Sequence, residues 1–345
     1  MKDIELNGIT LEESREYMVN IGEKGFRGEQ LFTFFNRNKG LDIQQAKVLP
    51  QNLRESLAKS QMITKVDILK RFDSNIDSTK KYLFLLEDKN IIEAVLMEYD
   101  HGFSVCISTQ VGCRMGCSFC ASTKGGLLRN LTPGEMLNQI YLIEKDAKVD
   151  ISNIVLMGSG EPLDNYDNVL KFLNIIHEPK GHNISYRNIT LSTCGVVPRI
   201  YDLAKENLPI TLSISLHSPF DEYRANIMPI AKAYKIDELM KACRYYEEST
   251  GRRMTFEYTL IDGINDRIVD GERLVYLLRK LNAHINLIPL NPIKEYDGNR
   301  THRDGVERFK RYLLSKNINT TIRSEKGSDI SASCGQLRRD YLERD

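Results

Sequence analysis

The sequence predicts an α/β protein in which a partial, TIM-like (β/α)6 barrel follows a helical region and a β-hairpin. Strand-like runs alternate with helical runs from residue 103 onward, which is typical of a parallel sheet or barrel. Helical patterns fill residues 1–62, and short β-type runs occupy residues 63–98. The chain has 345 residues, enough to bury one large core together with a smaller attached domain.

The first predicted domain, residues 1–62, is a small helical accessory module. Thr10 and Glu13 have the spacing of a capping box, which marks the start of a helix. Gly25–Gly28 then separates this helix from the apolar-periodic run Gln30–Phe35. A predicted hairpin region, residues 63–98, follows this module.

The strands of the predicted hairpin are Lys80–Leu86 and Ile91–Met97, joined by the turn-forming residues Asp88–Asn90. The core domain, residues 99–345, comes next. Its six strand-like runs are 103–109, 153–157, 188–192, 211–217, 254–260 and 285–290. A second capping box with Pro at the first helical position, Thr132–Glu135, predicts the start of the first crossover helix.

Polar motifs follow five of the six strand-like runs of the core. They are the cysteine-rich loop after residue 110, Gly158–Leu163, Ser192–Gly195, Ser215–His217 and Asn291-Pro292. An α/β barrel builds its functional site from the loops at the C-terminal ends of its strands. The sequence therefore predicts one site at this edge of the sheet.

Composition limits the class of protein. The net charge is only +1, so any site for a polyanion must be a local basic patch. The N-terminus lacks an apolar signal core, and no run reaches the roughly 20 apolar residues that span a bilayer, so we expect a cytoplasmic protein without membrane attachment. Seven cysteines in a reducing compartment indicate metal ligation or redox catalysis rather than a disulfide framework.

Cys113, Cys117 and Cys120 form a Cys-x3-Cys-x2-Cys triplet. Thiols this close in the sequence are interpreted as ligands of one soft metal centre. Zinc and ordinary iron–sulfur sites use four protein ligands, whereas the next cysteine toward the C-terminus is Cys194. Three cysteines on a cube of four irons leave one iron open for a ligand that reacts. The alternative is a structural zinc knuckle that a distant His or Cys completes.

This triplet resembles the signature of the radical S-adenosylmethionine (SAM) superfamily, in which an aromatic residue, here Phe119, precedes the last cysteine. The resemblance implies a partial barrel of the radical SAM type, a [4Fe-4S] cluster on the three cysteines, and SAM at the open iron. Gly160, Glu161 and Pro162 match the Gly-Glu-Pro motif, whose glycine backbone and carboxylate meet the SAM amino group. Standing alone, such a motif is more often a strand-to-helix turn.

The same resemblance assigns further SAM contacts to residues at strand ends. Ser192, Ser215 and His217, with Leu216 between the last two, are candidate partners of the SAM carboxylate and ribose. Asn291 is a candidate partner of the adenine. Each polar residue of this group, taken singly, is more often a strand-end residue that satisfies nearby backbone groups.

Members of the radical SAM superfamily catalyse many different reactions, and two further cysteines help to distinguish among them. Cys106 lies on the strand before the triplet, where a small buried side chain is the ordinary interpretation. Cys334 lies in Ser333–Gln336, whose polar and glycine neighbours are typical of an exposed loop. Cys194 and Cys243 are interpreted as packing cysteines.

Together these motifs resemble the RlmN/Cfr family of RNA adenosine methyltransferases over nearly the whole chain. The resemblance rests further on Gln110–Cys113, Arg129–Thr132, Ser215–Pro219, Met228-Pro229, Gly263–Asn265 and Ser333–Gln336. Gly160–Pro162 and Pro289–Pro292 resemble the members that methylate carbon C2 of adenosine rather than C8. Ala121–Thr123 departs from the usual Ala-Thr-Gly, which bears on the loop beside the cluster and not on its ligands.

The family resemblance implies a reaction that uses two SAM molecules. The first methylates Cys334, which must react as a thiolate. The second gives an adenosyl radical that takes a hydrogen from the S-methyl group, and the methylene radical adds to C2. Cys106 then releases the RNA by forming a Cys106–Cys334 disulfide, which cellular thiols reduce. Glu93 matches the proposed base, although its spacing fits an exposed polar residue of an alternating strand equally well.

The resemblance also implies partners: 23S rRNA in its peptidyl-transferase region and, in some members, the tRNA adenosine 3′ of the anticodon. We expect an electron donor of flavodoxin or ferredoxin type, a thiol reductant and a monomeric protein. Cations that contact RNA phosphates or form a solvated face are Lys24, Arg27, Arg300, His302, Arg303, Arg308, Lys310, Arg311, Arg323, Lys326, Arg338 and Arg339.

Two other functions remain open from the sequence. One is a different radical SAM activity, such as C8 methylation of RNA or activation of a protein. The other is an iron–sulfur or zinc protein that only binds RNA or passes electrons. Identification of the methylated carbon separates the first from C2 methylation, and SAM cleavage by the reduced protein excludes the second.

Overall fold

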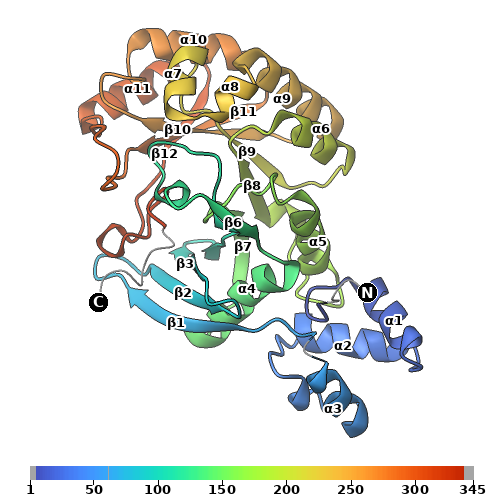
Figure 1. Ribbon diagram of the computed structural model, residues 1–345. Helices are drawn as coiled ribbons and strands as arrows, with labels where there is room; N and C mark the ends of the chain where they lie inside the picture. The colour runs from blue at the N-terminus through green and yellow to red at the C-terminus, as the bar shows by residue number, and fades with distance from the viewer. Residues whose placement is uncertain (1–4, 61, 338–345) are drawn as a thin grey trace.

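The computed structural model of this protein describes residues 5–60 and 62–337. Its main feature is a sheet of ten strands in the order β1-β2-β3-β4-β7-β8-β9-β10-β11-β12 (Figure 1). The strands are β1 (Val66–Asp73), β2 (Lys80–Leu86), β3 (Ile91–Tyr99), β4 (Gly102–Cys106), β7 (Ile151–Leu156), β8 (Ile189–Thr193), β9 (Thr211–Ser215), β10 (Met254–Leu260), β11 (Ala283–Pro289) and β12 (Asn319–Ile322). A separate antiparallel pair is formed by β5 (Gln110–Gly112) and β6 (Leu127–Asn130).

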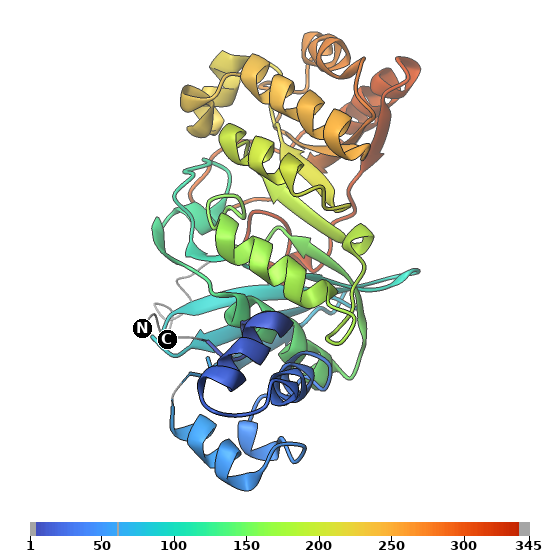
Figure 2. The same cartoon turned by 90° about the vertical axis from the view of Figure 1, so that its right-hand side faces the viewer.

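The part of the sheet from β4 to β12 is parallel. Its connecting helices follow one another along one side of the sheet (Figures 1 and 2). They are α4 (Pro133–Ala147), α5 (Tyr166–His177), α6 (Val197–Lys205), α7 (Asp221–Ile227), α8 (Ile230–Ala233), α9 (Ile236–Thr250), α10 (Ile268–Leu278) and α11 (Arg303–Ser315). Six strand–helix units, from β4–α4 to β11–α11, confirm the predicted (β/α)6 barrel.

The parallel sheet has one strand more than the sequence analysis predicts. The additional strand is β12, which pairs in parallel with β11. Its four residues, Asn-Thr-Thr-Ile, are mostly polar and mostly accessible, so they lack the continuous apolar run that marks an inner parallel strand. By contrast, all seven residues of the inner strand β10 are buried.

The two predicted capping boxes are both present. Thr10 Oγ accepts from the Glu13 backbone N–H at 3.3 Å, and the Glu13 carboxylate accepts from the Thr10 N–H at 2.8 Å. Thr132 and Glu135 repeat the arrangement at the start of α4, with Pro133 as the first helical residue. These side chains satisfy amide donors that a helix start leaves without partners.

The N-terminal residues form three helices, α1 (Leu11–Asn20), α2 (Phe26–Asn36) and α3 (Gln51–Lys59). They enclose an apolar cluster of their own: Leu6, Ile9, Met18, Leu31, Phe34, Phe35, Ile43, Ala46, Leu49, Leu53 and Leu57. Phe32 faces the other way and joins the main core beneath the sheet. The Thr132 hydroxyl donates to the Glu5 carboxylate at 2.6 Å, so this region is fixed to the start of α4.

Strands β1, β2 and β3 continue the sheet beyond β4 with antiparallel pairing. The C-terminal segment, residues 323–337, leaves the opposite edge strand β12 and returns to these strands (Figure 1). There the Ser74 hydroxyl donates to Asp329 at 2.7 Å, and the Gly327 N–H donates to Asp77 at 3.0 Å. The segment therefore crosses the open side of the barrel and ties its two ends together.

None of the helices in the described part of the chain combines the length and apolar character that crossing a bilayer requires.

Candidate active site

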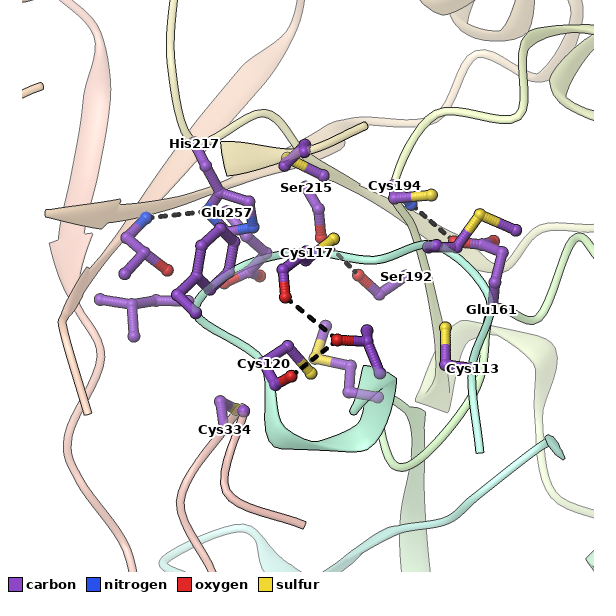
Figure 3. A pocket seen from close by; sticks show the side chains of 18 of the residues that line it. Cys113, Cys117, Cys120, Glu161, Ser192, Cys194, Ser215, His217, Glu257 and Cys334 are labelled. Carbon is purple, nitrogen blue, oxygen red and sulfur yellow. Dashed lines mark hydrogen bonds between the residues drawn. The ribbon is translucent and has the colours of Figure 1, made fainter. Parts of the chain in front are cut away.

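A cavity lies at the C-terminal ends of the parallel strands, where the sequence predicts the site (Figure 3). Loops after β4, β7, β8, β9 and β11 reach it, and the C-terminal segment covers it from the open side of the barrel. Ten of the predicted site residues line it: Cys113, Cys117, Cys120, Gly160, Glu161, Ser192, Ser215, His217, Asn291 and Cys334. Residues spread over more than 200 positions of the chain thus meet in one place.

The cysteine loop begins at the end of β5. Gly112 has a φ of +75°, and a Cβ there would lie only 1.9 Å from the Gly126 carbonyl oxygen, so the turn into Cys113 requires glycine. The Cys113 N–H then donates to the same carbonyl at 3.0 Å. The Thr123 hydroxyl donates to the Cys117 carbonyl at 3.2 Å and to the Cys120 carbonyl at 2.9 Å. These bonds turn the three thiols toward the cavity.

The donor set of the triplet fits an iron–sulfur cluster. Cys113 and Cys117 are buried, Cys120 is half-buried, and none forms a disulfide. Burial raises the pKa of all three thiols, to about 12 for Cys113, so proton loss needs a compensating positive charge such as iron supplies. Among the described residues, no three His, Cys, Asp or Glu side chains converge on a single-ion site. All three thiols line the same cavity, as ligands of separate irons of one cluster would.

The Gly-Ser-Gly-Glu turn after β7 is packed against the end of β4. Gly160 has a φ of +113°, and a Cβ there would meet Gln110 Cβ and Thr109 Oγ1 at 2.7 Å. The Glu161 carboxylate, buried in the cavity wall, accepts from the Cys194 N–H at 2.7 Å and the Leu163 N–H at 3.0 Å. Burial raises the pKa of Glu161, and these hydrogen bonds counter the rise. The carboxylate is therefore held in one orientation at the cavity.

Ser192 and Ser215 end neighbouring strands β8 and β9, and their hydroxyls are 3.5 Å apart. His217 follows with a φ of +53°, and its Nδ1 accepts from the Thr259 N–H at 2.9 Å. Its ring meets the ring of Phe119 edge-on, with the centroids 4.9 Å apart. The aromatic residue of the cysteine loop thus contacts the loop after β9.

Leu216 and Asn291 differ from the other predicted SAM contacts in what they offer to the cavity. The Leu216 side chain is fully buried and outside the cavity lining, and its N–H donates to the Glu257 carbonyl. The Asn291 amide lines the cavity but donates to the Cys334 carbonyl at 2.9 Å. This bond leaves the amide oxygen of Asn291 as the group that can accept from a bound molecule.

Cys334 lies in a loop that is docked onto the cysteine triplet. The Ala121 N–H donates to the Gly335 carbonyl at 2.8 Å, and the Ser122 hydroxyl donates to the Leu337 carbonyl at 2.9 Å. The Gln336 amide donates to the Pro292 carbonyl at 3.2 Å. Cys334 is half-buried and faces the same cavity as the triplet (Figure 3).

Cys106 lies next to this loop rather than in the cavity lining. It packs in an apolar cluster with Val95 and Met97 of β3 and with Ala332 and Leu337 of the C-terminal segment. Burial, and next the charge of a Cys334 thiolate, raise the pKa of Cys106 to about 12. The two cysteines are thus close enough to influence each other's charge.

Glu93 is buried on β3, so the exposed interpretation of its strand position is wrong. Its carboxylate lies 3.7 Å from the Lys81 ammonium, which is also buried. In the antiparallel register Val95 stands opposite Cys106, and Glu93 is two residues from Val95. Residues at this spacing share a face of the sheet, so Glu93 and Cys106 project to the same side.

The sequence analysis missed two charged groups of the cavity wall. Glu257 on β10 accepts from Ser213 Oγ at 3.0 Å and Asn286 Nδ2 at 3.0 Å, and lies 3.4 Å from Arg323. Glu257 lies in the strand Met254–Leu260, which contains no recognisable motif, so the sequence does not mark it. Arg323, expected among the RNA-facing cations, lines the cavity beside Cys334, whose negative charge raises the pKa of the guanidinium.

Cys194 packs in an apolar cluster with Ile227 and Met228, as expected of a packing cysteine, and in addition it lines the cavity. Its signal in the sequence is its place in a strand-end motif, Ser192–Gly195. Among the candidate RNA-facing cations, Arg300 pairs with Glu325 at 2.6 Å, and Arg303 and Lys310 line a neighbouring cavity. Arg338 and Arg339 lie outside the described residues.

The chain is similar in sequence to known radical SAM proteins over nearly its whole length. Residues 107–271 match the radical SAM superfamily. A relative from Alkaliphilus oremlandii, a probable dual-specificity RNA methyltransferase RlmN, is 52% identical over 344 residues, covering 99% of this chain and 100% of that protein. A relative of the same name from Lachnoclostridium phytofermentans is 50% identical over 341 residues, covering 99% of this chain and 96% of that protein.

A solved structure agrees with the sequence comparisons. The crystal structure of a radical SAM methyltransferase from Sphaerobacter thermophilus matches with a TM-score of 0.94 and 42% sequence identity, and covers 98% of this chain and 100% of that one. Its fold and length are therefore those of the present protein. A radical SAM enzyme of this family uses a [4Fe-4S] cluster and SAM, and an RNA methyltransferase acts on RNA. The chain belongs to the RlmN family of radical SAM RNA methyltransferases.

Proposed function

We propose that this protein methylates carbon C2 of an adenosine in the peptidyl-transferase region of 23S rRNA, and that Cys334 carries the methyl group. The observation that supports this most is the docking of the Cys334 loop onto the cysteine triplet through Ala121 and Ser122. C2 of adenine is electron-poor, so it does not attack the methyl group of SAM as a nitrogen or oxygen nucleophile does. A carbon radical carried by the protein avoids this limitation.

Cys113, Cys117 and Cys120 are the residues that would hold the cluster. When bound there, a [4Fe-4S] cluster supplies the single electron that cleaves the sulfonium of SAM. Glu161, held by two backbone N–H groups, offers its carboxylate to the SAM amino group. Ser192, Ser215, His217 and the amide oxygen of Asn291 offer hydrogen bonds to the remaining polar groups of SAM, and Gly160 contributes backbone. Leu216 lies between Ser215 and His217, and its backbone groups bond within the protein. The cavity wall excludes water around them.

Cys334 acts first as a nucleophile. Its thiolate takes the methyl group of one SAM, which leaves as S-adenosylhomocysteine. Arg323 lines the cavity beside Cys334 and places a positive charge next to the sulfur that reacts. The methylated Cys334 then loses a hydrogen atom to the adenosyl radical that a second SAM would supply, and the resulting S-methylene radical on Cys334 adds to adenine C2.

Cys106 and Glu93 complete the reaction. Glu93 takes the proton from C2, and the adduct radical loses one electron, which a bound cluster would accept. The Cys106 thiolate then attacks the sulfur of Cys334. The carbon–sulfur bond to the RNA breaks as a Cys106–Cys334 disulfide forms, the released carbon takes a proton to become the methyl group, and cellular thiols then reduce the disulfide. Ala332 and Leu337 of the segment that bears Cys334 pack in one cluster with Cys106, which supports this pairing.

The partners follow from this proposal. The relatives are named dual-specificity RNA methyltransferases, which supports a tRNA substrate beside rRNA, with the adenosine 3′ of the anticodon as its target. We infer that the protein is a cytoplasmic monomer. Residues 1–62 are the RNA-binding module, residues 63–98 the hairpin region and residues 99–345 the catalytic domain. A flavodoxin- or ferredoxin-type protein supplies the electron.

The test is methylation by the reconstituted protein under anaerobic conditions. Purified protein is loaded with iron and sulfide, reduced, and incubated with SAM and an unmodified 23S rRNA fragment. Digestion of the RNA to nucleosides should yield 2-methyladenosine. A yield of 8-methyladenosine would support the C8 reaction instead, and intact SAM in the presence of RNA would contradict a radical reaction altogether.

A further inference from the structure

The guanidinium group of Arg224 is buried in the protein interior beside the cysteine loop. Its side chain lies on α7, and 0% of its surface is exposed. Nε donates to the Leu216 carbonyl at 3.1 Å, and Nη2 donates to the Cys194 carbonyl at 2.7 Å and the Ser215 carbonyl at 3.3 Å. These carbonyls lie at the ends of β8 and β9 that face the cavity. Arg224 therefore joins the ends of two strands that carry the site.

The positive charge of Arg224 has no ion-pair partner among the described carboxylates. Asp221, one turn earlier on α7, acts on the guanidinium only through its charge and forms no ion pair with it, because its carboxylate accepts from the Ile236 N–H at 2.8 Å. Carbonyl groups satisfy the hydrogen bonds of a guanidinium but do not neutralise it. An uncompensated buried charge is costly, so proteins pair such charges with an anion or a metal-bound group.

The cysteine loop, which would be anionic in the loaded protein, is joined to the end of α7, the helix that carries Arg224. The Ser118 N–H, one residue after Cys117, donates to the carbonyl of Ile227 at the end of α7, at 2.9 Å. Cys117 packs in one apolar cluster with Cys194, Ile227 and Met228. Arg224 thus stands behind the loop whose three thiolates would carry the cluster, in a region that water does not screen.

We propose that Arg224 is a positioning residue whose fixed positive charge compensates the thiolate-bound cluster and favours its one-electron reduction. The inference rests on the proposed cluster site. A cluster gains one negative charge when it accepts an electron from the flavodoxin- or ferredoxin-type donor. A cation held nearby at low dielectric stabilises the reduced form more than the oxidised form, because the attraction grows with the added charge.

Two substitutions separate charge from hydrogen bonding. Arg224→Gln keeps an amide donor for the carbonyls and removes the charge, whereas Arg224→Lys keeps the charge and loses the forked geometry. Arg199→Gln is the matched control, because Arg199 is solvent-accessible on α6 and pairs with Asp202. The readout is the midpoint potential of the cluster in the full-length reconstituted protein, followed by electron paramagnetic resonance.

Arg224→Gln should shift the potential in the negative direction, by about tenfold in the reduction equilibrium, which is about 59 mV for one electron. Arg224→Lys should restore most of the shift, and Arg199→Gln should have no effect. A wild-type potential in Arg224→Gln would overturn the inference and show a purely structural role. If Arg224→Gln does not fold, a strongly lowered potential in Arg224→Lys, which keeps the charge, would also overturn it.

A second measurement distinguishes this inference from the proposed function. Cluster loading should raise the melting temperature less in Arg224→Gln than in the wild type, because the variant has no buried charge for the cluster to compensate. An equal rise in the two proteins would contradict the role of the charge. Failure of the wild-type protein to assemble a cluster at all would instead sink the proposed function.

Discussion

The imidazole of His217 lies in the wall of the cavity, where its surroundings determine its charge. Its Nδ1 accepts from the Thr259 N–H, so the neutral ring carries its proton on Nε2. Burial, together with the nearby charge of Arg224, lowers the pKa of His217 from 6.5 to about 3. The ring therefore offers Nε2–H as a hydrogen-bond donor to a bound molecule at neutral pH.

We predict that His217 stays neutral between pH 8 and about 5, as followed by the ring resonances in NMR. The unfolded chain binds a proton at this residue below 6.5 and the folded protein does not, so the contribution of His217 to stability is lost as pH falls from 6.5 toward 3. The free energy of unfolding should fall less steeply over this range in His217→Asn. A titration midpoint near 6.5 for His217 would contradict the buried, neutral ring.

Glu161 supplies the carboxylate at the same cavity. Glu161→Gln should weaken SAM binding by about 10- to 100-fold, because a charge-assisted hydrogen bond is worth about 1.5–3 kcal/mol. Iron content should stay near that of the wild type, since the cysteine ligands are untouched. The measurements are SAM affinity by calorimetry and iron by chemical assay, with the exposed Glu98→Gln as control. Unchanged affinity in Glu161→Gln would remove this residue from the SAM site.

Single residues differ in how far the sequence reveals them. Cys113, Cys117 and Cys120 are local in the chain, so their spacing alone indicates a shared ligand. Glu257 and Arg224 are not recognisable in this way. Glu257 lies in a strand that contains no motif, and Arg224 lies in a short helix whose acidic first turn predicts an exposed position. Their burial depends on contacts across the barrel, which local patterns do not record.

At the scale of elements, the C-terminal segment is held by two acidic side chains. Asp329 accepts from Ser74 Oγ at 2.7 Å and from the Asn75 N–H at 2.8 Å. Asp77 accepts from the Gly327 N–H at 3.0 Å and the Thr79 N–H at 2.9 Å. Asp329 lies in the chain between β12 and Cys334, and Asp77 lies in the β1–β2 turn that this segment contacts, so the two carboxylates position the reactive loop.

The double variant Asp77→Asn/Asp329→Asn should loosen this segment. We expect slower methylation of Cys334, measured by mass spectrometry of its peptide under single turnover, because the thiol is held less firmly over the cavity. Iron content and SAM affinity should stay normal. Asp304→Asn, at a side chain that is 92% exposed, is the matched control. Cys334 methylation at the wild-type rate in the double variant would show that these contacts do not position the loop.

Element prediction succeeded where the periodic pattern and the packing agree. The six main strands and the two capping boxes follow from runs of apolar residues and from Thr-x-x-Glu spacing. Strand β12 was not predicted because Asn319–Ile322 is short and polar. It becomes a strand by pairing with β11. The return of the segment beyond it depends on contacts 250 or more residues apart in the chain, such as Gly327 with Asp77.

At the scale of the whole molecule, the barrel remains open and the C-terminal segment closes it. The edge strands β1 and β12 lie at the two ends of the sheet order, and the segment that bears Cys334 bridges the gap between them. This closure places Cys334 over the cysteine triplet and beside Cys106 of β4. The two cysteines come together only in the complete fold, across 228 positions of sequence from 106 to 334.

The most direct test of this account is the fate of RNA in Cys106→Ala. The variant can still methylate Cys334 and attach it to adenine, but it lacks the thiol that releases the product. Cys243→Ala, at a buried cysteine of α9, is the matched control and should turn over normally. Cys334→Ala should methylate no RNA.

The account predicts that Cys106→Ala accumulates a covalent protein–RNA complex, stable on denaturing gels. Peptide and nucleoside mass spectrometry should locate the link between Cys334 and C2 of the target adenosine. Release of methylated RNA by Cys106→Ala at the wild-type rate, or a link through any other residue, would contradict the two-cysteine reaction.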